Sequence, residues 1–342
     1  MFRTLSVVVL LALVGCPGTK TVTAPAGGTK NDNDNDNNGA PNRVREVEAT
    51  VLENYRLFAN GSSASYAQGI ARDRAVAIAG ITPNLVLVGE WPDGIEDDRR
   101  PYQARAVRIV SKNLDVHIAE NPSVAWVSDE LSYRVPYKGR EASVPIRFTG
   151  VYVRDIDRWL VVMEHMSYAL PMSSILDKAQ RNELSILPPI PKQEGEGASK
   201  SADQIKKIIK AKLDRWHKPG TPVSDLVAAD TDVLVMWPDA DAEYRGLAAS
   251  AAPKLSEGFG DKATLVSSQY RVFVGGSQTV AWAIANHTVR LDTKKTVDMR
   301  ATYVLEQRGR TDKWTIVQAH ASVPLHIRQI DQRVFGLRRR KP

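Results

Sequence analysis

The sequence has very little of the residues that most often carry covalent or metal chemistry. Its 342 residues include one cysteine and six histidines. A single cysteine allows no disulfide within the chain, which is typical of a protein whose core is large enough to fold without cross-links. A nucleophile elbow, a phosphate-binding loop and a dinucleotide fingerprint are also missing, and no His, Asp and Glu residues have convincing metal-ligand spacing. We therefore predict no cofactor and no bound metal.

The N-terminal apolar run, Val7–Val14, is too short to span a bilayer as a helix. Arg3 precedes this run, and Leu13-Val14-Gly15-Cys16 ends it in a way that resembles a bacterial lipobox. Residues 1–15 are therefore predicted to be a lipoprotein signal peptide, and Cys16 to be the acylated residue that holds the protein on a lipid bilayer. The alternative is a chance match within an ordinary secretion signal. The prediction places the protein in a bacterial cell envelope, on the outside of the cytoplasmic membrane or on the outer membrane.

Residues 16–43 lack apolar periodicity and are rich in Gly, Pro, Thr, Asn and Asp. Such a segment cannot bury enough surface to fold, which predicts a disordered tether. The Asn and Asp run at 31–38 resembles the first half of a calcium-binding loop. However, Arg45 stands where such a loop requires a bidentate glutamate. A polar spacer is therefore the favoured interpretation.

Positive charge is in modest excess and gathers at the C-terminus. The formal net charge is +7, and residues 329–342 end in the basic run Arg338-Arg339-Arg340-Lys341. A basic tail of this kind solvates the terminus, and on a lipid-anchored protein it can contact anionic headgroups. No nucleic-acid reader motif is present, so nucleic acid is not expected as a partner.

The chain repeats a set of short motifs in the same order. Four motifs occur twice, 146 to 156 residues apart. Trp91-Pro92-Asp93 recurs as Trp237-Pro238-Asp239, and Val124-Ala125-Trp126 recurs as Val280-Ala281-Trp282. Arg147-x-Thr149 recurs as Arg300-x-Thr302, and the combination of Trp159 and His165-x-Ser167 recurs as Trp314 and His320-x-Ser322. Insertions in loops explain the drift in spacing, and a period this long indicates two globular domains. The predicted domains are 44–178 and 201–328, joined by a Pro-stiffened linker at 179–200.

Each copy is expected to contain helices followed by a run of antiparallel strands, which indicates the α+β class. Apolar periodicity predicts helices at 44–58, 62–79, 102–111, 201–216 and 242–259. Strands are predicted at 85–88, 113–119, 123–135, 143–154, 158–170, 232–237, 263–274, 278–291, 296–306 and 313–324. Strict alternation in the strand at 158–170 places Trp159, Met163 and His165 on one face. Both faces of this strand are apolar, so we expect cover on both sides.

Two segments of the second copy carry a family resemblance: Arg300-Ala-Thr-Tyr-Val-Leu-Glu-Gln307 and Lys313-Trp-Thr-Ile-Val-Gln-Ala-His-Ala-Ser-Val-Pro324. They resemble the Arg-x-Thr and W-x-I-V-H-x-H-x-S-x-P strands of the SnoaL-like branch of the nuclear transport factor 2-like superfamily, and the first copy matches less closely. The resemblance implies two tandem cone-shaped domains, each a curved antiparallel sheet wrapped around N-terminal helices, with a pocket at the open end. Because such domains commonly dimerise through the outer sheet face, we expect an intramolecular pseudo-dimer; the alternative is two independent domains on a linker.

His165 and His320 are the candidate catalytic residues, because they are repeated and are expected to face the cone interior. Each stands two residues from a serine on its strand, and could act as a general base or bind a ligand. A buried structural histidine is the alternative. The residues predicted to bind a ligand are Trp126, Glu130, Arg147, His165, Ser167, Trp282, Arg300, His320 and Ser322. Asp93 and Asp239 follow Trp-Pro and are more typical of turns than of catalytic bases.

The favoured hypothesis for function is a membrane-anchored lipoprotein that binds a small apolar ligand or an envelope protein without catalysis. The alternative is an isomerase or hydro-lyase that uses a cone histidine as general base, and a third possibility is a purely structural module. The family often has a further histidine where this chain has Met163 and Gln318, which weakens acid–base chemistry. The superfamily contains both enzymes and non-enzymes, so the resemblance does not decide the activity.

Overall fold

The structure is a computed structural model, and it describes the chain between Gly39 and Leu325 with several gaps. The described residues are 39–59, 67–90, 108–137, 140–168, 170–191, 200–216, 226–228, 232–239, 242–247, 263–291, 295–308 and 313–325. The predicted signal peptide, Cys16, the motif Trp91–Asp93 and the basic tail at 329–342 lie outside these residues. Among the described residues, no helix combines the length and the apolar character needed to cross a bilayer.

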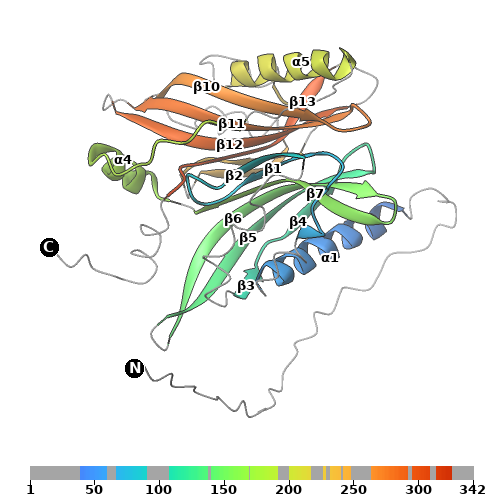
Figure 1. Cartoon of the computed structure of the whole chain (residues 1–342), viewed down its shortest axis with the longest axis horizontal. Helices are drawn as coiled ribbons and strands as arrows, with labels where there is room; N and C mark the ends of the chain where they lie inside the picture. The colour runs from blue at the N-terminus through green and yellow to red at the C-terminus, as the bar shows by residue number, and fades with distance from the viewer. Residues whose placement is uncertain are drawn as a thin grey trace, which may run out of the picture. The chain divides into compact units, whose positions relative to one another are not determined.

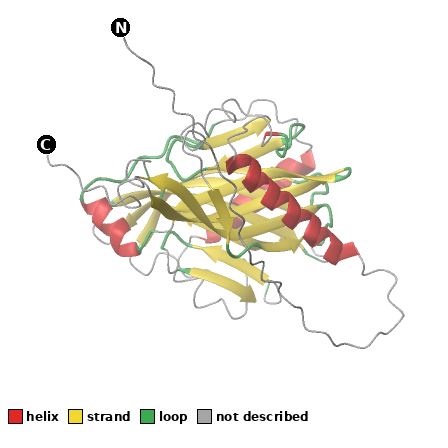
Figure 2. Ribbon diagram, turned by 90° about the horizontal axis from the view of Figure 1, so that it is seen from below, coloured by secondary structure: helices red, strands yellow, loops and turns green. Residues whose placement is uncertain are grey.

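The first half, residues 39–180, is a mixed sheet with one long helix on one face (Figures 1 and 2). Its elements are α1 (Gly39–Ala59), β1 (Ala75–Ala79), β2 (Val86–Glu90), β3 (Arg108–Ser111), β4 (Asp115–Ile118), β5 (Val124–Tyr137), β6 (Arg140–Asp155), β7 (Arg158–Tyr168) and α4 (Met172–Gln180). The strand order is β2-β1-β7-β6-β5-β3, and β4 also pairs with β5. Helix α1 packs against β3, β4 and β7, and its buried Tyr55 meets the Phe148 ring edge-on at 5.4 Å.

The second half, residues 200–325, has the same plan. Its elements are α5 (Lys200–Trp216), β8 (Asp232–Met236), β9 (Glu243–Leu247), β10 (Ala263–Val274), β11 (Val280–Leu291), β12 (Thr296–Gln307) and β13 (Trp314–Ser322). The strand order is β10-β11-β12-β13-β8-β9. Helix α5 packs on β10 through a face that includes Ile209, Leu213 and Trp216. The α+β class and the two tandem cone domains predicted from the sequence are thereby confirmed.

A β-bulge at the same place in both halves shows that the duplication extends to the backbone. In β7 the ladder with β6 slips by one residue at Val162, and in β13 the ladder with β12 slips at Val317. These residues are 155 positions apart, as are Trp159 and Trp314. Bulges are kept within families because they set the bend and twist of a strand, so this recurrence supports a common origin for the two halves.

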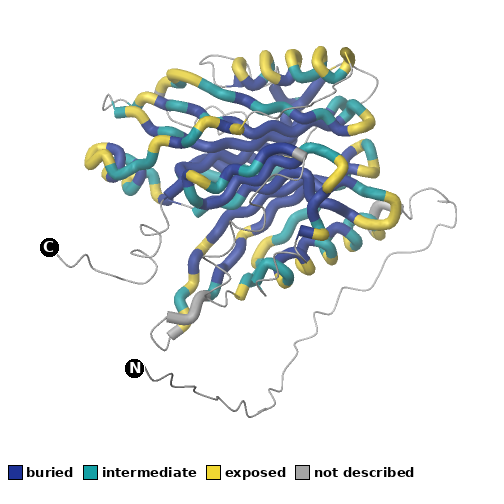
Figure 3. Tube along the Cα trace, viewed as in Figure 1, coloured by how far each residue is buried: buried dark blue, intermediate teal, exposed yellow. Residues whose placement is uncertain are grey.

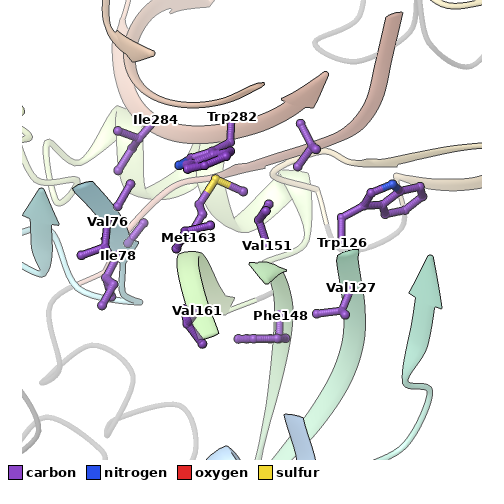
Figure 4. Packing of buried hydrophobic residues seen from close by; sticks show 14 of the residues in the cluster. Val76, Ile78, Trp126, Val127, Phe148, Val151, Val161, Met163, Trp282 and Ile284 are labelled. Carbon is purple, nitrogen blue, oxygen red and sulfur yellow. The ribbon is translucent and has the colours of Figure 1, made fainter. Parts of the chain in front are cut away.

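The bulge also corrects the predicted alternation along β7. Trp159 and Val161 lie on the face that is covered by α1, where the Trp159 indole donates a hydrogen bond to Glu46 at 3.3 Å. Beyond the bulge, Met163 and His165 lie on the opposite face, and Figure 4 shows Met163 pointing toward Trp282 while Val161 points away from it. One extra residue in a strand moves every side chain beyond it to the opposite face of the sheet. The prediction that Trp159 and His165 share a face was therefore wrong.

Three predicted helices are also wrong where the structure describes them. Within 62–79, 102–111 and 242–259 the structure has the strands β1, β3 and β9. Short apolar or Ala-rich runs do not distinguish helix from strand, and here pairing with neighbouring strands decides the outcome. The long strands β5–β7 and β10–β13 lie close to where alternation placed them.

One of the repeated motifs does not mark equivalent positions. Parallel pairing aligns Ala77 of β1 with Met163 and Leu234 of β8 with Gln318, so Trp237 corresponds to Gly80. Trp91 instead follows β2, which ends at Glu90. The two Trp-Pro-Asp sequences therefore stand after different strands, and this match in the sequence was accidental.

The outer faces of the two sheets, those turned away from α1 and α5, pack against each other (Figure 1). The large apolar cluster of the first half continues into the second through residues such as Trp282, Ile284 and Val304. A separate cluster fills the space between α5 and the second sheet. Figure 3 shows the buried part of the chain concentrated in the facing strands. Outside this contact, the segment around Pro188 lies on the second sheet. The carbonyl oxygen of Pro188 accepts a hydrogen bond there from the Asn286 side chain at 2.8 Å.

Candidate functional site

The candidate catalytic histidines meet each other between the two sheets. The His165 and His320 rings stack with centroids 3.9 Å apart, and both side chains are fully buried. His165 Nδ1 and Nε2 are hydrogen-bonded to Thr302 at 3.1 Å and Ser322 at 2.8 Å. His320 makes the equivalent pair of bonds, Nδ1 to Thr149 at 3.0 Å and Nε2 to Ser167 at 2.7 Å. Every bond crosses between the halves, so the repeated Thr, His and Ser positions form one pseudo-symmetric polar core.

The repeated arginines reinforce this contact in the same crosswise manner. Arg147 Nη1 donates to the carbonyl oxygens of Trp237 at 2.6 Å and Asp239 at 3.3 Å, which belong to the turn after β8. Arg300 donates to the carbonyl oxygens of Thr82, Pro83 and Leu85, at 2.9–3.3 Å, in the turn after β1. Each guanidinium thus binds the corresponding turn of the other half. Asp239 accepts a hydrogen bond from the first amide of α4, Met172 N, at 3.2 Å and has a structural role there.

The two tryptophans predicted to bind a ligand also lie on the outer faces. The Trp126 indole donates to Glu306 of the second half at 2.9 Å, and the Trp282 ring stacks with Phe273. Glu130, which lies four residues after Trp126 on β5, is exposed. Its counterpart Asn286 is covered by the segment around Pro188, which explains why these matched positions differ.

Burial makes this contact unfavourable for added positive charge. The pKa of His165 lies well below its usual value because of burial, with further lowering by Arg300 and Arg147. The pKa of His320 is also well below its usual value because of burial, with further lowering by His165, when that ring is protonated, and by Arg147. Burial lowers the pKa of Arg147 to about 10 and that of Arg300 to about 9. Both arginines therefore stay protonated near neutral pH and the two histidines stay neutral.

The predicted site residues are therefore brought together, but not in the cone. Eight of the nine are buried between the halves and Glu130 is solvent-exposed. The expectation that His165 and His320 face the cone interior was wrong, because the bulges at Val162 and Val317 invert the alternation, so that these side chains lie on the outer face of each sheet. The repeated residues are those that each half contributes to the pseudo-symmetric contact between the halves. They do not line a pocket in the cone.

A cavity does lie in the cone of the first half. It is lined by Phe58, Ile78, Ala79, Gly80, Ile81, Leu85, Leu87, Tyr133, Glu164 and Met166, and its empty space, including the part open to solvent, is about 480 Å³. The lining is apolar apart from Glu164 and the Tyr133 hydroxyl, which donates to the Met166 sulfur at 3.1 Å. Apolar walls with few polar groups are typical of small-molecule sites.

Buried polar residues lie between α1 and the sheet in this cone. They are Asn54, Tyr55, Asp129, Tyr152 and Glu164, and each is at most 6% exposed. Within the described part of the chain, Asn54 Nδ2, Tyr55 Oη, Asp129 Oδ2 and Tyr152 Oη form no hydrogen bond of normal geometry. Tyr55 nevertheless lies within hydrogen-bonding reach of Asp129, and Asn54 of Tyr152, since the first lowers the pKa of Asp129 and the second lowers that of Tyr152. The cluster therefore consists of close polar pairs buried between α1 and the sheet.

The electrostatics of the cluster show that its members are near neighbours. Burial raises the pKa of Tyr55 well above its usual value, and the carboxylates of Asp129 and Glu164 raise it further. The pKa of Tyr152 is likewise raised by burial and by Glu164. Burial also raises the pKa of Asp129, against the opposing effect of hydrogen bonds such as those from the backbone amides of Lys112 at 3.3 Å and Asn113 at 3.0 Å.

The cone of the second half has lost this cluster. Strand register places Ala285, Leu305 and Ala319 where the first half has Asp129, Tyr152 and Glu164. Aromatic side chains fill much of its interior, including the stacked pair of Trp216 and Trp237 with centroids 6.2 Å apart. A polar trio remains, in which His287 is hydrogen-bonded to Ser268 at 2.8 Å and to Tyr303 at 2.8 Å. Both ring nitrogens are occupied, so His287 is a satisfied core residue.

The cone cluster of the first half was not predicted from the sequence, because the candidate residues were those that both copies share. The useful signal was the opposite one: Glu164 and Asp129 are charged residues in apolar strands whose counterparts are alanines. Among the described residues there is no group of three or more His, Cys, Asp or Glu that could hold a metal ion.

Comparison with known proteins identifies the same domain in both halves. The profile of the family described as SnoaL-like domain matches residues 47–171 and 221–326, which together exceed half of the chain. No curated protein matches the chain. An NTF2-like protein of unknown function from Pseudomonas putida KT2440 is 16% identical, with 40% of this chain and 92% of that chain covered and a TM-score of 0.34.

Two further solved structures are similar to the same extent. An NTF2-like protein with a cystatin-like fold from Novosphingobium aromaticivorans is 13% identical, with 39% of this chain and 90% of that chain covered and a TM-score of 0.33. A protein of the NTF2-like family from Streptomyces avermitilis, provisionally named a dehydratase, is 16% identical, with coverage of 38% and 98% and a TM-score of 0.32.

Proposed function

We propose that this chain, which belongs to the SnoaL-like domain family, is a binding protein whose first half holds a small, largely apolar ligand in its cone without catalysis. The second half serves as a fixed partner for the first. A membrane anchor at Cys16 keeps the protein in the bacterial cell envelope. Of the two occupants expected from the sequence, a small ligand or an envelope protein, the cone favours the ligand.

The asymmetry between the two cones carries this proposal. The first cone has an apolar cavity with buried polar groups beside it, and the second has alanine, leucine and aromatic residues at the matching places. Both halves keep the residues of the contact between them. Among the described residues, the contact is kept on both sides and the buried polar cluster on one side, which fits one binding domain supported by a second domain.

A cavity-filling substitution tests the ligand site. Leu87 lines the cavity, and its counterpart in the second half is Tyr244. We expect Leu87→Tyr to abolish the thermal stabilisation that hits from a library of small apolar compounds give the natural protein. Leu52→Tyr, at an exposed position of α1, is the matched control and should keep the hits. If no compound stabilises the natural protein, or if Leu87→Tyr leaves every hit unchanged, the cone is not the site.

The membrane anchor rests on the lipobox-like sequence before Cys16. Several acyl chains give stable anchoring, because each buried methylene contributes about 0.8 kcal/mol. We expect the natural protein made in a bacterial host to enter the detergent phase and to incorporate labelled palmitate, and Cys16→Ser to do neither. Labelling of Cys16→Ser at the natural level would contradict the anchor.

The pseudo-dimer is proposed as the arrangement of the two halves in solution. Its support is the crosswise set of hydrogen bonds made by His165, His320, Arg147 and Arg300. Cleavage at a protease site inserted between 192 and 199 tests it. We expect the cleaved halves to co-elute in gel filtration, whereas elution as two separate monomers would contradict a pseudo-dimer.

An isomerase or hydro-lyase that uses a cone histidine as base has less support in the first half. His165 is fully hydrogen-bonded between the sheets, and His117 stacks on Trp126 of the outer face. The cone of that half holds carboxyl and phenol groups instead. Turnover of any hit from the compound library, abolished by Leu87→Tyr, would replace the binding proposal with an enzymatic one.

A further inference from the structure

The turn between β1 and β2 forms much of the cavity wall in the first half. Six of the ten residues that line the cavity lie on these two strands and on the turn that joins them, between Ile78 and Leu87. The turn is tightly folded, since the Gly80 amide donates to the Leu85 carbonyl oxygen at 2.9 Å. A side-chain carbon added at Gly80 would lie only 1.8 Å from Leu85 Cδ2. Because these two lining residues pack directly on each other, a shift of the turn would change the shape of the wall.

The second half provides four hydrogen bonds to this turn. The guanidinium of Arg300 donates to three of its carbonyl oxygens at 2.9–3.3 Å, those of Thr82, Pro83 and Leu85. The backbone amide of Leu325 donates to the carbonyl oxygen of Ile81 at 3.2 Å. Ile81 and Leu85 both line the cavity. Part of the cavity wall in one half is therefore held in place by residues of the other half.

The hold on the turn is buried and charged. Arg300 is fully buried and, with a pKa lowered by burial to about 9, remains protonated near neutral pH. Hydrogen bonds from an ionised donor are stronger than those between neutral groups. Strand β1 also lies against β11 of the second half, where Figure 4 shows Val76 beside Ile284. Loss of the guanidinium would thus remove a strong donor from three carbonyl oxygens of a segment that shapes the cavity.

Arg147 provides an internal comparison. It is buried to nearly the same extent as Arg300, and it donates to the carbonyl oxygens of Trp237 and Asp239 in the turn after β8. Neither of these two residues lines the cavity of the first half. The two arginines therefore make equivalent contacts between the halves and differ in whether the turn that they hold belongs to this cavity.

We propose that the second half positions the ligand site of the first, with Arg300 as a positioning residue that, together with the Leu325 amide, holds the Ile81–Leu85 turn in the conformation that a ligand requires. The proposal rests on the proposed function, since it needs a ligand in the cone, and it adds how that site is controlled. Coupling between two sites is reciprocal, so a ligand in the cone should in turn stabilise the contact between the turn and the second half.

The test uses N-phenyl-1-naphthylamine, a neutral apolar dye whose fluorescence rises on burial, in titrations of the full-length protein; a thermal-shift hit takes its place if the dye is not bound. Arg300→Leu should weaken binding at least about tenfold, which corresponds to about 1.4 kcal/mol. Arg300→Lys keeps the charge, but one ammonium group does not replace the guanidinium fork, so its affinity should lie between those of Arg300→Leu and the natural protein. Arg147→Leu is the matched control. It should lower the free energy of unfolding to a similar extent and change the affinity by less than about twofold.

The outcomes separate this inference from the proposed function. Equal or greater weakening in Arg147→Leu, or natural affinity in Arg300→Leu, would overturn the positioning role while leaving the cavity in place, provided that Leu87→Tyr still abolishes binding. If Leu87→Tyr binds the probe as the natural protein does, or if neither the dye nor any library compound binds, the proposed function fails together with this inference.

A measurement on the natural protein keeps the test decisive if Arg300→Leu does not fold. The amide of Leu325 belongs to the second half and donates to the turn, so saturation with the probe should slow its hydrogen exchange several-fold. The amide of Ala242, which donates to the Asp239 carbonyl oxygen at 3.2 Å in the turn held by Arg147, should be slowed less. Equal slowing of the two amides, or no slowing at Leu325, would contradict the coupling.

Discussion

At the scale of single residues, the repeated side chains form a contact rather than a pocket. His165 is hydrogen-bonded to one threonine and one serine of the other half, and His320 mirrors it. Neutral imidazole has one donor and one acceptor nitrogen, and hydroxyl groups can play either part. Each ring is therefore satisfied without any charge, in a place where charge would be costly.

Removal of one hydroxyl from this network should lower stability measurably. In Ser322→Ala, His165 Nε2 keeps its buried position and loses its partner, so we expect the free energy of unfolding to fall by about 1–3 kcal/mol. Ser167→Ala should have a similar effect, because it does the same to His320. Urea unfolding followed by circular dichroism measures both. Ser277→Ala, at an exposed turn, is the control and should change the value by less than about 0.5 kcal/mol. A loss in Ser322→Ala no larger than in this control would contradict the network.

At the scale of elements, the sequence was most informative where a pattern is long. Strands of nine or more residues, such as β5 and β6, show an alternation that local propensity cannot imitate. Five-residue strands such as β1 and β9 show no such pattern, and their pairing with distant strands decides their conformation. The face of the candidate histidines depended on one bulged residue, Val162, whose effect no periodicity reveals. The cone cluster was missed for a related reason, since Asp129 and Glu164 lie on different strands and both come within electrostatic reach of Tyr55 only in the folded protein.

The turn between β6 and β7 holds a residue that is poorly suited to its backbone. Ile156 has φ of 54° and is 93% exposed, although β-branched residues strongly disfavour left-handed conformations. Ile156→Asn should therefore raise the free energy of unfolding, by up to about 1 kcal/mol, because asparagine tolerates this region. Ile186→Asn is the matched control, since Ile186 is equally exposed without positive φ. Thermal melts of the two variants measure the change, and an equal effect in both would show that any gain comes from replacing an exposed apolar side chain and not from relief of the backbone.

At the scale of the whole molecule, the contact between the halves concentrates groups that oppose protonation. The charged and titratable groups facing the histidine pair are the histidines themselves, Arg147 and Arg300, and no carboxylate is among the groups that shift either histidine. Thr149, Thr302, Ser167 and Ser322 complete the surroundings and are neutral. Protonation of one ring would place a third positive charge in a buried site and would disfavour protonation of the other ring.

This arrangement predicts that mild acid lowers the free energy of unfolding by destabilising the contact between the two halves. The pKa of each histidine in the folded protein lies below the unfolded value of about 6.5, so the unfolded chain binds more protons below that pH. Stability from this source is complete above about pH 6.5 and falls by up to about 1.4 kcal/mol per pH unit for each histidine as the pH decreases toward 5. Burial raises the pKa of Asp129 and of Glu306, which has the opposite effect on stability, so the histidine part must be isolated by difference. In the double variant His165→Gln with His320→Gln, unfolding free energies measured in urea between pH 5 and pH 7 should lose most of this slope, whereas His117→Gln should keep it. An unchanged slope in the double variant would show that the acid response arises elsewhere.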